Sequence, residues 1–347
     1  MRHARYIGAA IAAGIAAIVW GVFAVLDPVA ALRAWLAAFV WTTMAPVGAL
    51  ALLLIHRITG GEWGEALAPV LEPAAKAILP AAVLGLPVLA FSGLIYRWAD
   101  PEVPANVARS FMNPVLFGVR SVVALALWSL IAWRPTLRNS AARAGASLLV
   151  LSIITNIIPV DWVISTQPGF YSSGFGFGFG IEQMLAALAL AALLGPQGED
   201  RRECHDLAGL IIATLLGFIY FFYMQFTIIW YGNIPQKTIW YVIRGRSPWP
   251  EIGALAFAFG AVFPFAALLN KTVRETQRPL RLIGASMSAA IALHVIWLIV
   301  PSFGIAALAP AIAAITMSAF LFAVWLGWNG IVWTRLTDTK AAVQHGC

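Results

Sequence analysis

Stretches of about twenty mostly apolar residues recur along this chain, and short loops that carry most of its charged residues separate them. A helix needs about 20 apolar residues to cross the hydrocarbon core of a bilayer. Each stretch therefore predicts a transmembrane helix, because only helices and closed barrels satisfy the backbone inside lipid. The expected spans are 7–26, 31–55, 74–96, 114–133, 144–163, 175–194, 207–230, 252–269, 282–300 and 311–333.

These spans predict an all-α integral membrane protein with about ten transmembrane helices in one polytopic domain, residues 1–347. The residues are 61% hydrophobic and 11% charged, and the mean hydropathy is +0.85, values that exclude an ordinary soluble fold. The run 7–26 is long enough for a full crossing, so it is interpreted as a span rather than a cleaved signal peptide. Four prolines at positions 69–87 predict a kink in or near the third span.

The formal net charge of +7 does not indicate a nucleic-acid partner, because the basic residues lie between the apolar spans. Fifteen of the 22 Lys and Arg residues fall on the side that holds both termini, and seven fall on the other side. Short loops rich in Lys and Arg stay in the cytoplasm. We therefore expect both termini to be cytoplasmic. The loops are too short to contain a soluble catalytic domain.

Residue spacing argues against several kinds of cofactor site. Membrane b-type haems need paired axial histidines, and only His294 of the five histidines lies deep in a predicted span. Cys204 and Cys347 have neither metal-binding nor redox spacing. The run Gly174–Gly180 (GFGFGFG) opens an apolar span with no preceding strand, so it indicates tight helix packing rather than a nucleotide site. We expect no bound metal.

Five of the predicted spans carry a strongly polar side chain at a similar depth below the outer face. These side chains are Arg120, Asn156, Glu182, Gln225 and His294. Small residues recur one turn away on the same helical faces, and such stripes mark helix–helix contacts. We therefore expect the polar groups to point inward. Because an unpaired charge inside lipid is costly, we expect Arg120 and Glu182 to compensate one another.

Two interpretations of this polar layer stay open. In the first, the layer holds the helices together, with an ion pair and with Asn, Gln and His side chains that satisfy helix backbones. In the second, the layer forms a quinone pocket or a proton relay, since both need buried ionisable groups at one depth. Taken alone, His294 fits a hydrogen-bonded packing residue better than a ligand.

The segment His205–Trp249 carries the most specific pattern in the chain. It includes HDLAGL…YFFYMQFTIIWYGNIPQKTIWYVIR. This pattern resembles HDLG…YxxFSQYxLIWYANIPEETxWYxxR in the second NrfD-like membrane subunit (quinone-binding subunit 2) of alternative complex III, a bacterial quinol:cytochrome c or electron-acceptor oxidoreductase. Further matches are Thr59-Gly60-Gly61-x-Trp63, Asn113-Pro114-x-x-Phe117-x-x-Arg120, Asp161-Trp162-Val163-x-Ser165-x-x-Pro168 and Trp297-Leu298-x-x-Pro301.

The resemblance implies ten helices, with spans two to five and six to nine forming two four-helix bundles. It implies a subunit of the bacterial inner membrane that binds no cofactor of its own and supports quinol oxidation and proton translocation. The expected partners are a homologous NrfD-like quinol-binding subunit, an iron–sulfur subunit and a c-type cytochrome subunit. Iron–sulfur and haem groups belong to these partners, and quinone or quinol is the candidate ligand of the membrane part.

The polar layer and the resemblance together give two sets of candidate site residues. The candidates for a proton relay are Glu182, Arg120, His294 and Asp161. The candidates for lining a quinone pocket are Gln225, Asn156, Asn233 and Tyr231. Glu182 is expected to exchange the proton, and His294 to relay it or to hydrogen-bond a quinol oxygen. The positions that match the family by motif are Asp161, Arg120, Gln225, Asn233 and the pair His205-Asp206.

Two other functions remain alternatives. A purely structural or assembly subunit would use the polar layer only to fix the register of its helices. A secondary transporter ranks last, because internal repeats and helices interrupted at the midplane are typical of transporters, and neither is evident in the sequence.

Overall fold

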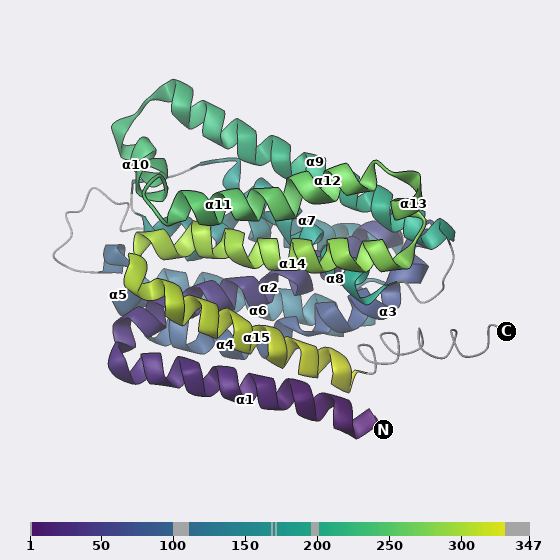
Figure 1. The fold of residues 1–347 in the computed structure, drawn as a ribbon, viewed down its shortest axis with the longest axis horizontal. Coiled ribbons are helices and arrows are strands. Elements are labelled where there is room, and N and C mark those ends of the chain that lie inside the picture. Colours follow the sequence, from purple (N-terminus) through teal and green to yellow (C-terminus); the bar gives the residue numbers. More distant parts are fainter. Residues whose placement is uncertain (1, 100–110, 168, 171, 196–200, 330–347) are drawn as a thin grey trace.

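The computed structural model describes residues 2–99, 111–167, 169–170, 172–195 and 201–329 (Figure 1). Every regular element in these residues is helical. The longer helices are α1 (Arg2–Leu26), α2 (Pro28–Thr59), α3 (Glu62–Lys76), α4 (Ile78–Ala90), α6 (Pro114–Trp133), α7 (Ala141–Trp162), α8 (Phe175–Leu194), α9 (Arg201–Gly232), α10 (Pro235–Arg244), α11 (Trp249–Phe257), α14 (Gln277–Ile299) and α15 (Leu308–Trp328). The shorter α-helices are α5 (Ser92–Ile95), α12 (Phe263–Leu268) and α13 (Lys271–Arg274).

Nine helical segments in the described part of the chain are long and apolar enough to cross a membrane. Two of them join two α-helices each: Glu62–Ala90 contains α3 and α4, and Trp249–Leu268 contains α11 and α12. Helix α1 contributes a further apolar stretch, Ala10–Leu26, beside these nine segments. These helical segments confirm the predicted class, an all-α multi-pass membrane protein.

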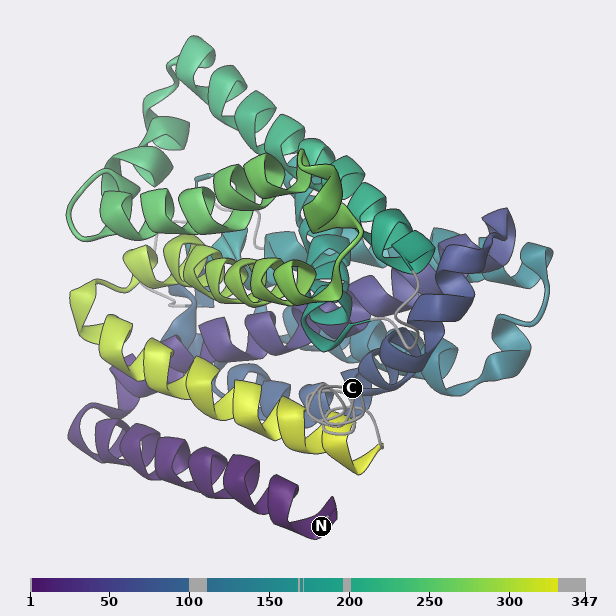
Figure 2. The ribbon, with the colours of Figure 1, turned by 45° about the vertical axis from the view of Figure 1, so that its right-hand side comes forward.

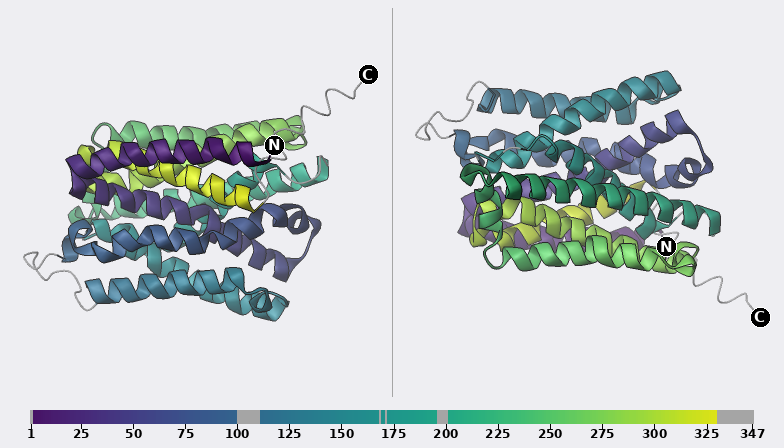
Figure 3. Two further views of the ribbon diagram at one scale, coloured as in Figure 1. Left: turned by 90° about the horizontal axis from the view of Figure 1, so that it is seen from below. Right: turned by 90° about the horizontal axis from the view of Figure 1, so that it is seen from above.

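The long helices run side by side between two ends that carry the loops (Figure 3). Helix α1 packs against α15, and α2 and α8 pack against each other in the interior (Figure 1). Helix α9 lies at an outer edge, and its C-terminal end stands away from the other helices before α10 leads the chain back (Figure 2). The buried centre of the molecule therefore lies around α2 and α8, and α9 borders it.

Helix starts follow local capping chemistry. The Asp27 carboxylate accepts a hydrogen bond from the Ala30 backbone N–H at 2.9 Å, and Pro28 occupies the first position of α2. The Asn113 side chain caps α6 in the same way, through the Leu116 backbone N–H at 2.9 Å. Side-chain caps satisfy N–H groups that the first turn leaves free, and proline suits that turn because its own N–H is missing.

Glycines let α8 approach two of its neighbours, α2 and α14, closely. A Cβ atom on Gly48 of α2 would collide with the backbone of Gln183, and one on Gly284 of α14 would collide with the backbone of Leu193 and Ala189. Close backbone approach through small residues is a common mode of helix packing in membranes. These two contacts fix the position of α8 between α2 and α14.

The third segment begins earlier than the predicted 74–96. Glu62 and other acidic residues lower the hydropathy ahead of position 74, yet this stretch forms α3. Helix α3 buries Leu67, Val70 and Leu71, and it packs against α2. The helix is interrupted at Ala77, within the proline-containing region in which the kink was expected. The prediction of a kink is therefore consistent with the structure, and the predicted start was wrong. Positions 330–333 of the last predicted span lie outside the described residues.

Candidate functional site

Glu182 of α8 and His294 of α14 form a buried acid–histidine pair. The distance from Glu182 Oε1 to His294 Nδ1 is 2.6 Å, and the side chains are 3% and 13% exposed. The close approach of α8 and α14 at Gly284 places the two side chains within reach of each other. Two of the four proton-relay candidates therefore meet in space.

Aromatic rings enclose the His294 imidazole. Phe218 and Phe222 of α9 meet it edge-on, each with a centroid distance of 5.5 Å, and Trp297 of α14 stacks on it at 5.8 Å. The second ring nitrogen, Nε2, is buried and has no hydrogen-bond partner among the described residues. A carboxylate can only accept, so an ionised Glu182 accepts a hydrogen bond from the Nδ1–H group, and the Nε2 lone pair stays free.

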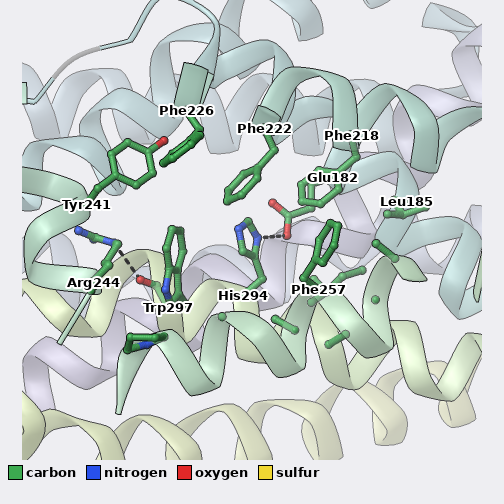
Figure 4. Close-up of a pocket in the computed structure, with 18 residues that line it drawn as sticks. Glu182, Leu185, Phe218, Phe222, Phe226, Tyr241, Arg244, Phe257, His294 and Trp297 are labelled. Atoms are coloured by element: carbon green, nitrogen blue, oxygen red, sulfur yellow. Dashed lines mark hydrogen bonds and ion pairs between the residues drawn. The ribbon is translucent and has the colours of Figure 1, made fainter. Parts of the chain in front are cut away.

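A cavity of about 330 Å³ borders this pair (Figure 4). Its lining comes from α8, α9, α10, α11, α14 and the π-helix Ala258–Val262. The lining residues are Glu182, Leu185, Phe218, Phe222, Phe226, Tyr241, Arg244, Gly245, Pro250, Gly253, Ala256, Phe257, Gly260, Ala261, Ala290, Ile291, His294 and Trp297. Most of these side chains are apolar or aromatic, and a few are polar, which is the usual make-up of a site for a small apolar ligand.

The wall formed by α11 and the π-helix depends on glycine. A Cβ atom on Gly253 would lie 2.8 Å from the Trp297 indole nitrogen, and one on Gly260 would lie 2.9 Å from the Ala290 Cβ atom. π-Helical turns inside α-helices occur frequently at functional sites, because the extra residue displaces the side chains that follow. The wall therefore combines two features that are typical of a binding site.

Arg244 of α10 lies at the other end of the cavity from Leu185 (Figure 4). It is buried and donates hydrogen bonds to the carbonyl oxygens of Trp297, Leu298 and Trp240. Its guanidinium carbon lies 3.2 Å from the Trp240 ring centroid. Burial lowers the pKa of the Arg244 guanidinium, although arginine remains charged in proteins. Arg244 thus ties α10 to the last turn of α14.

Tyr241, one turn before Arg244 on the same helix, connects the cavity to Gln225. The Gln225 amide nitrogen donates to the Tyr241 hydroxyl oxygen at 3.4 Å. Burial raises the pKa of the Tyr241 hydroxyl, against the lowering effects of Gln225 and Arg244. The hydroxyl therefore keeps its hydrogen at neutral pH. Gln225 does not line this cavity, although it borders a smaller one of about 30 Å³ that also touches His294.

Arg120 and Asp161, the other two proton-relay candidates, pair with each other. Arg120 Nε and Nη2 donate to the two Asp161 carboxylate oxygens at 2.6 and 2.9 Å. The expectation that Arg120 compensates Glu182 was therefore wrong. Helix α6, which carries Arg120, packs against α7, which carries Asp161. Glu182 instead meets the histidine of α14, and the expected single layer consists of separate groups.

The other candidates for a quinone pocket do not line the cavity. The Asn156 amide donates to the Ser152 carbonyl oxygen of its own helix at 2.9 Å. Tyr231, at the end of α9, is 87% exposed. Asn233 follows α9 with a positive φ of 43° and an exposed side chain. These three residues therefore lie outside the cavity at His294.

Several lining residues were not among the sequence candidates. Phe218, Phe222 and Trp297 supply the rings around His294, and Tyr241 and Arg244 supply polar groups. Aromatic residues in a membrane chain are too common to be singled out by type. Tyr241 and Arg244 did carry a signal, since both lie in the WYVIR part of the most specific motif.

The described residues contain no group of three or more His, Cys, Asp and Glu side chains that could hold a metal ion. A second cavity of about 320 Å³, between α2, α8, α14 and α15, has no ionisable residue in its lining. The cavity at Glu182 and His294 is therefore the better candidate for chemistry. Comparison with protein-family models finds no match to this chain, and comparison with curated proteins finds no significant match. Fold and site define an all-α multi-pass membrane protein with an acid–histidine pair beside an aromatic cavity.

Proposed function

We propose that this chain is a membrane subunit of a respiratory quinol:acceptor oxidoreductase of the alternative complex III type, and that the cavity at His294 binds quinol. One observation carries the proposal: a buried acid–histidine pair borders an aromatic cavity of about 330 Å³. The resemblance of the segment His205–Trp249 to an NrfD-like subunit supports it. The proposal includes ten spans in two four-helix bundles, both termini in the cytoplasm, and residence in a bacterial inner membrane.

The residues around the cavity suit a quinol ring. Phe222 and Trp297 offer aromatic faces and Phe226 an apolar wall, all of which favour a flat ring with an apolar tail. The His294 Nε2 lone pair can accept a hydrogen bond from a quinol hydroxyl group. The cavity volume lies at the lower end of the range for small-molecule sites, so it accommodates the ring and the first part of a tail.

Proton transfer follows from the arrangement of the pair. Oxidation of one quinol releases two protons and two electrons. His294 accepts one hydroxyl proton at Nε2 and passes its Nδ1 proton to Glu182, from which it leaves toward the outer face. The second proton follows the same route after the imidazole has exchanged its hydrogen from Nε2 back to Nδ1. A general base placed in this way contributes typically 10²–10⁴-fold to a rate. The iron–sulfur and haem groups expected on the partner subunits would accept the two electrons.

A structural subunit is the second candidate function. The Glu182–His294 contact joins α8 to α14 and Arg120–Asp161 joins α6 to α7, so both pairs hold helices together. In this candidate, the homologous quinol-binding partner performs all of the chemistry.

Purification of the tagged chain from its own membranes tests the membership of a complex. We expect iron–sulfur and c-type cytochrome polypeptides to co-purify. The eluate should show haem absorption, and its spectrum should change to that of reduced haem when either dithionite or quinol is added. A chain that purifies alone in mild detergent, without haem absorption, would contradict the respiratory assignment.

A further inference from the structure

The end of the cavity opposite Leu185 carries two hydrogen-bond donors, Tyr241 and Arg244, whereas Nε2 of His294 is a hydrogen-bond acceptor. Tyr241 and Arg244 lie three residues apart on α10, so they share one helical face. Both line the cavity that His294 lines. Trp297 lies between the two polar groups: its ring is 5.8 Å from the His294 ring centre and 5.6 Å from the Arg244 guanidinium carbon.

Arg244 brings a positive charge without a carboxylate partner among the described residues. Its hydrogen bonds all end on carbonyl oxygens of Trp240, Trp297 and Leu298, and no ion pair in the described chain includes it. Carbonyl oxygens at a helix C-terminus and the Trp240 ring stabilise such a charge in part. The remaining positive potential favours an electron-rich oxygen at this wall.

Tyr241 brings a hydrogen that has no acceptor in the described chain. Because the Gln225 amide donates to the Tyr241 oxygen, the amide occupies a lone pair and leaves the hydroxyl hydrogen free to donate. The close-up view places the hydroxyl group on the cavity side of α10, near Phe226 (Figure 4). A half-buried donor without an acceptor costs free energy unless a ligand or a water molecule accepts its hydrogen bond.

We propose that Tyr241 and Arg244 form a subsite for the second oxygen of the ligand, so that the cavity selects aromatic rings that carry a hydroxyl group at one end and an oxygen acceptor at the other. This inference rests on the proposed function, because it takes His294 as the partner of the first hydroxyl group. It adds the residues that hold the second oxygen of the ring, and with them the reason why a two-oxygen ring binds and a simple phenol does not.

Two redox-inert probes test the subsite without turnover. The first is a 4-methoxyphenol with a decyl chain, which has a hydroxyl group and an ether oxygen. The second has an ethyl group in place of the methoxy group. Binding to the purified wild-type complex is measured by quenching of tryptophan fluorescence. We expect the methoxy probe to bind about tenfold more tightly, the usual effect of one hydrogen bond with charge assistance.

Variants show which residues cause the preference for the methoxy probe over the ethyl probe. Tyr241→Phe keeps the ring packing against Phe170 and Phe226, and it should reduce the tenfold preference to within about twofold, as expected for the loss of one hydrogen bond. Arg244→Lys, which retains the charge but changes its geometry, should reduce the preference in part. His294→Gln should weaken both probes alike. Tyr223→Phe is the matched control, since Tyr223 is 62% exposed and does not line the cavity.

The outcomes separate the two proposals. Equal binding of the two probes to the wild type, or a preference that persists in both Tyr241→Phe and Arg244→Lys, would overturn the subsite and leave the proposed function intact. Absence of binding of either probe to the wild type would overturn the quinol site itself. The melting temperature of each variant is measured first, and Arg244→Lys carries the test if Tyr241→Phe does not assemble.

Discussion

At the scale of single residues, the contact between Glu182 and His294 gives the cavity its chemical character. The carboxylate fixes which ring nitrogen carries the hydrogen, and the aromatic rings of Phe218, Phe222 and Trp297 keep the other nitrogen away from water. Catalytic histidines are commonly oriented by a carboxylate in this way. In the proposed function, the pair acts as a base whose free ring nitrogen is shielded from water.

The Arg120–Asp161 pair has a structural role in this account, and Asp161→Asn tests that role. Asp161 is buried, and the substitution leaves the Arg120 charge without a carboxylate. Loss of one partner of a buried pair typically costs about 3–5 kcal/mol. We expect a clearly lower melting temperature in detergent and unchanged probe binding per folded molecule. A variant that melts like the wild type, or that loses probe binding while it stays folded, would contradict the structural role of the Arg120–Asp161 pair.

The sequence predicted that several helices carry polar side chains within their apolar spans, and it did not predict which of these side chains touch. Hydropathy gives the depth of Arg120 and Glu182 within a span, and depth was the reason to pair them. Pairing depends on which helices are neighbours, and this follows from packing contacts such as Gly284 against α8. Glycines at 48, 253, 260 and 284 are ordinary in the sequence, because nothing local distinguishes a glycine under a neighbouring backbone from one in open space.

At the scale of helices, α8 packs in the buried centre of the molecule and also contributes a residue to the cavity. Gly48 and Gly284 let α2 and α14 approach α8, and α8 carries Glu182 to the cavity. On the other side, α11 and the π-helix Ala258–Val262 form a wall that was expected from the sequence to be one regular span. The π-helical turn has no sequence signature in this chain, so only the structure shows it.

Gly253→Ala tests whether this wall shapes the cavity. The added Cβ atom would meet the Trp297 indole, so the ring must shift from its position between His294 and Arg244. Overpacking of this kind costs about 1–3 kcal/mol. We expect the affinity for the 4-methoxyphenol probe to fall about tenfold, with the complex still assembled. Gly118→Ala is the control, because a Cβ atom there meets nothing within 4 Å. Equal affinities of the two variants would contradict the proposed role of Gly253.

At the scale of the whole molecule, hydropathy alone predicted the class and most of the helical segments. Apolar runs of membrane-crossing length leave the backbone few alternatives to helices. Hydropathy missed the start of the third segment, because α3 contains acidic residues and still packs along α2. The proposed orientation, with both termini in the cytoplasm, is based on the distribution of Lys and Arg among the loops.

Cysteine labelling in intact cells tests the orientation. Thr136→Cys lies in the loop between α6 and α7, and Ser247→Cys lies between α10 and α11, at the opposite end of the molecule. Both positions are exposed. We expect a membrane-impermeant maleimide to label the cysteine at position 247 and to label the one at position 136 only after the membrane is opened. The reverse pattern would contradict cytoplasmic termini.

The proton relay through Glu182 is tested most directly by the rates of quinol oxidation and of proton release in the assembled complex that carries Glu182→Gln. The variant cannot accept the His294 proton, so we expect both rates to fall about 100-fold while assembly is unchanged. Glu72→Gln serves as the control, because Glu72 pairs with Arg138 at 2.8 Å outside the cavity. Wild-type rates in Glu182→Gln, or a loss of rate that only follows a loss of assembly, would contradict the account.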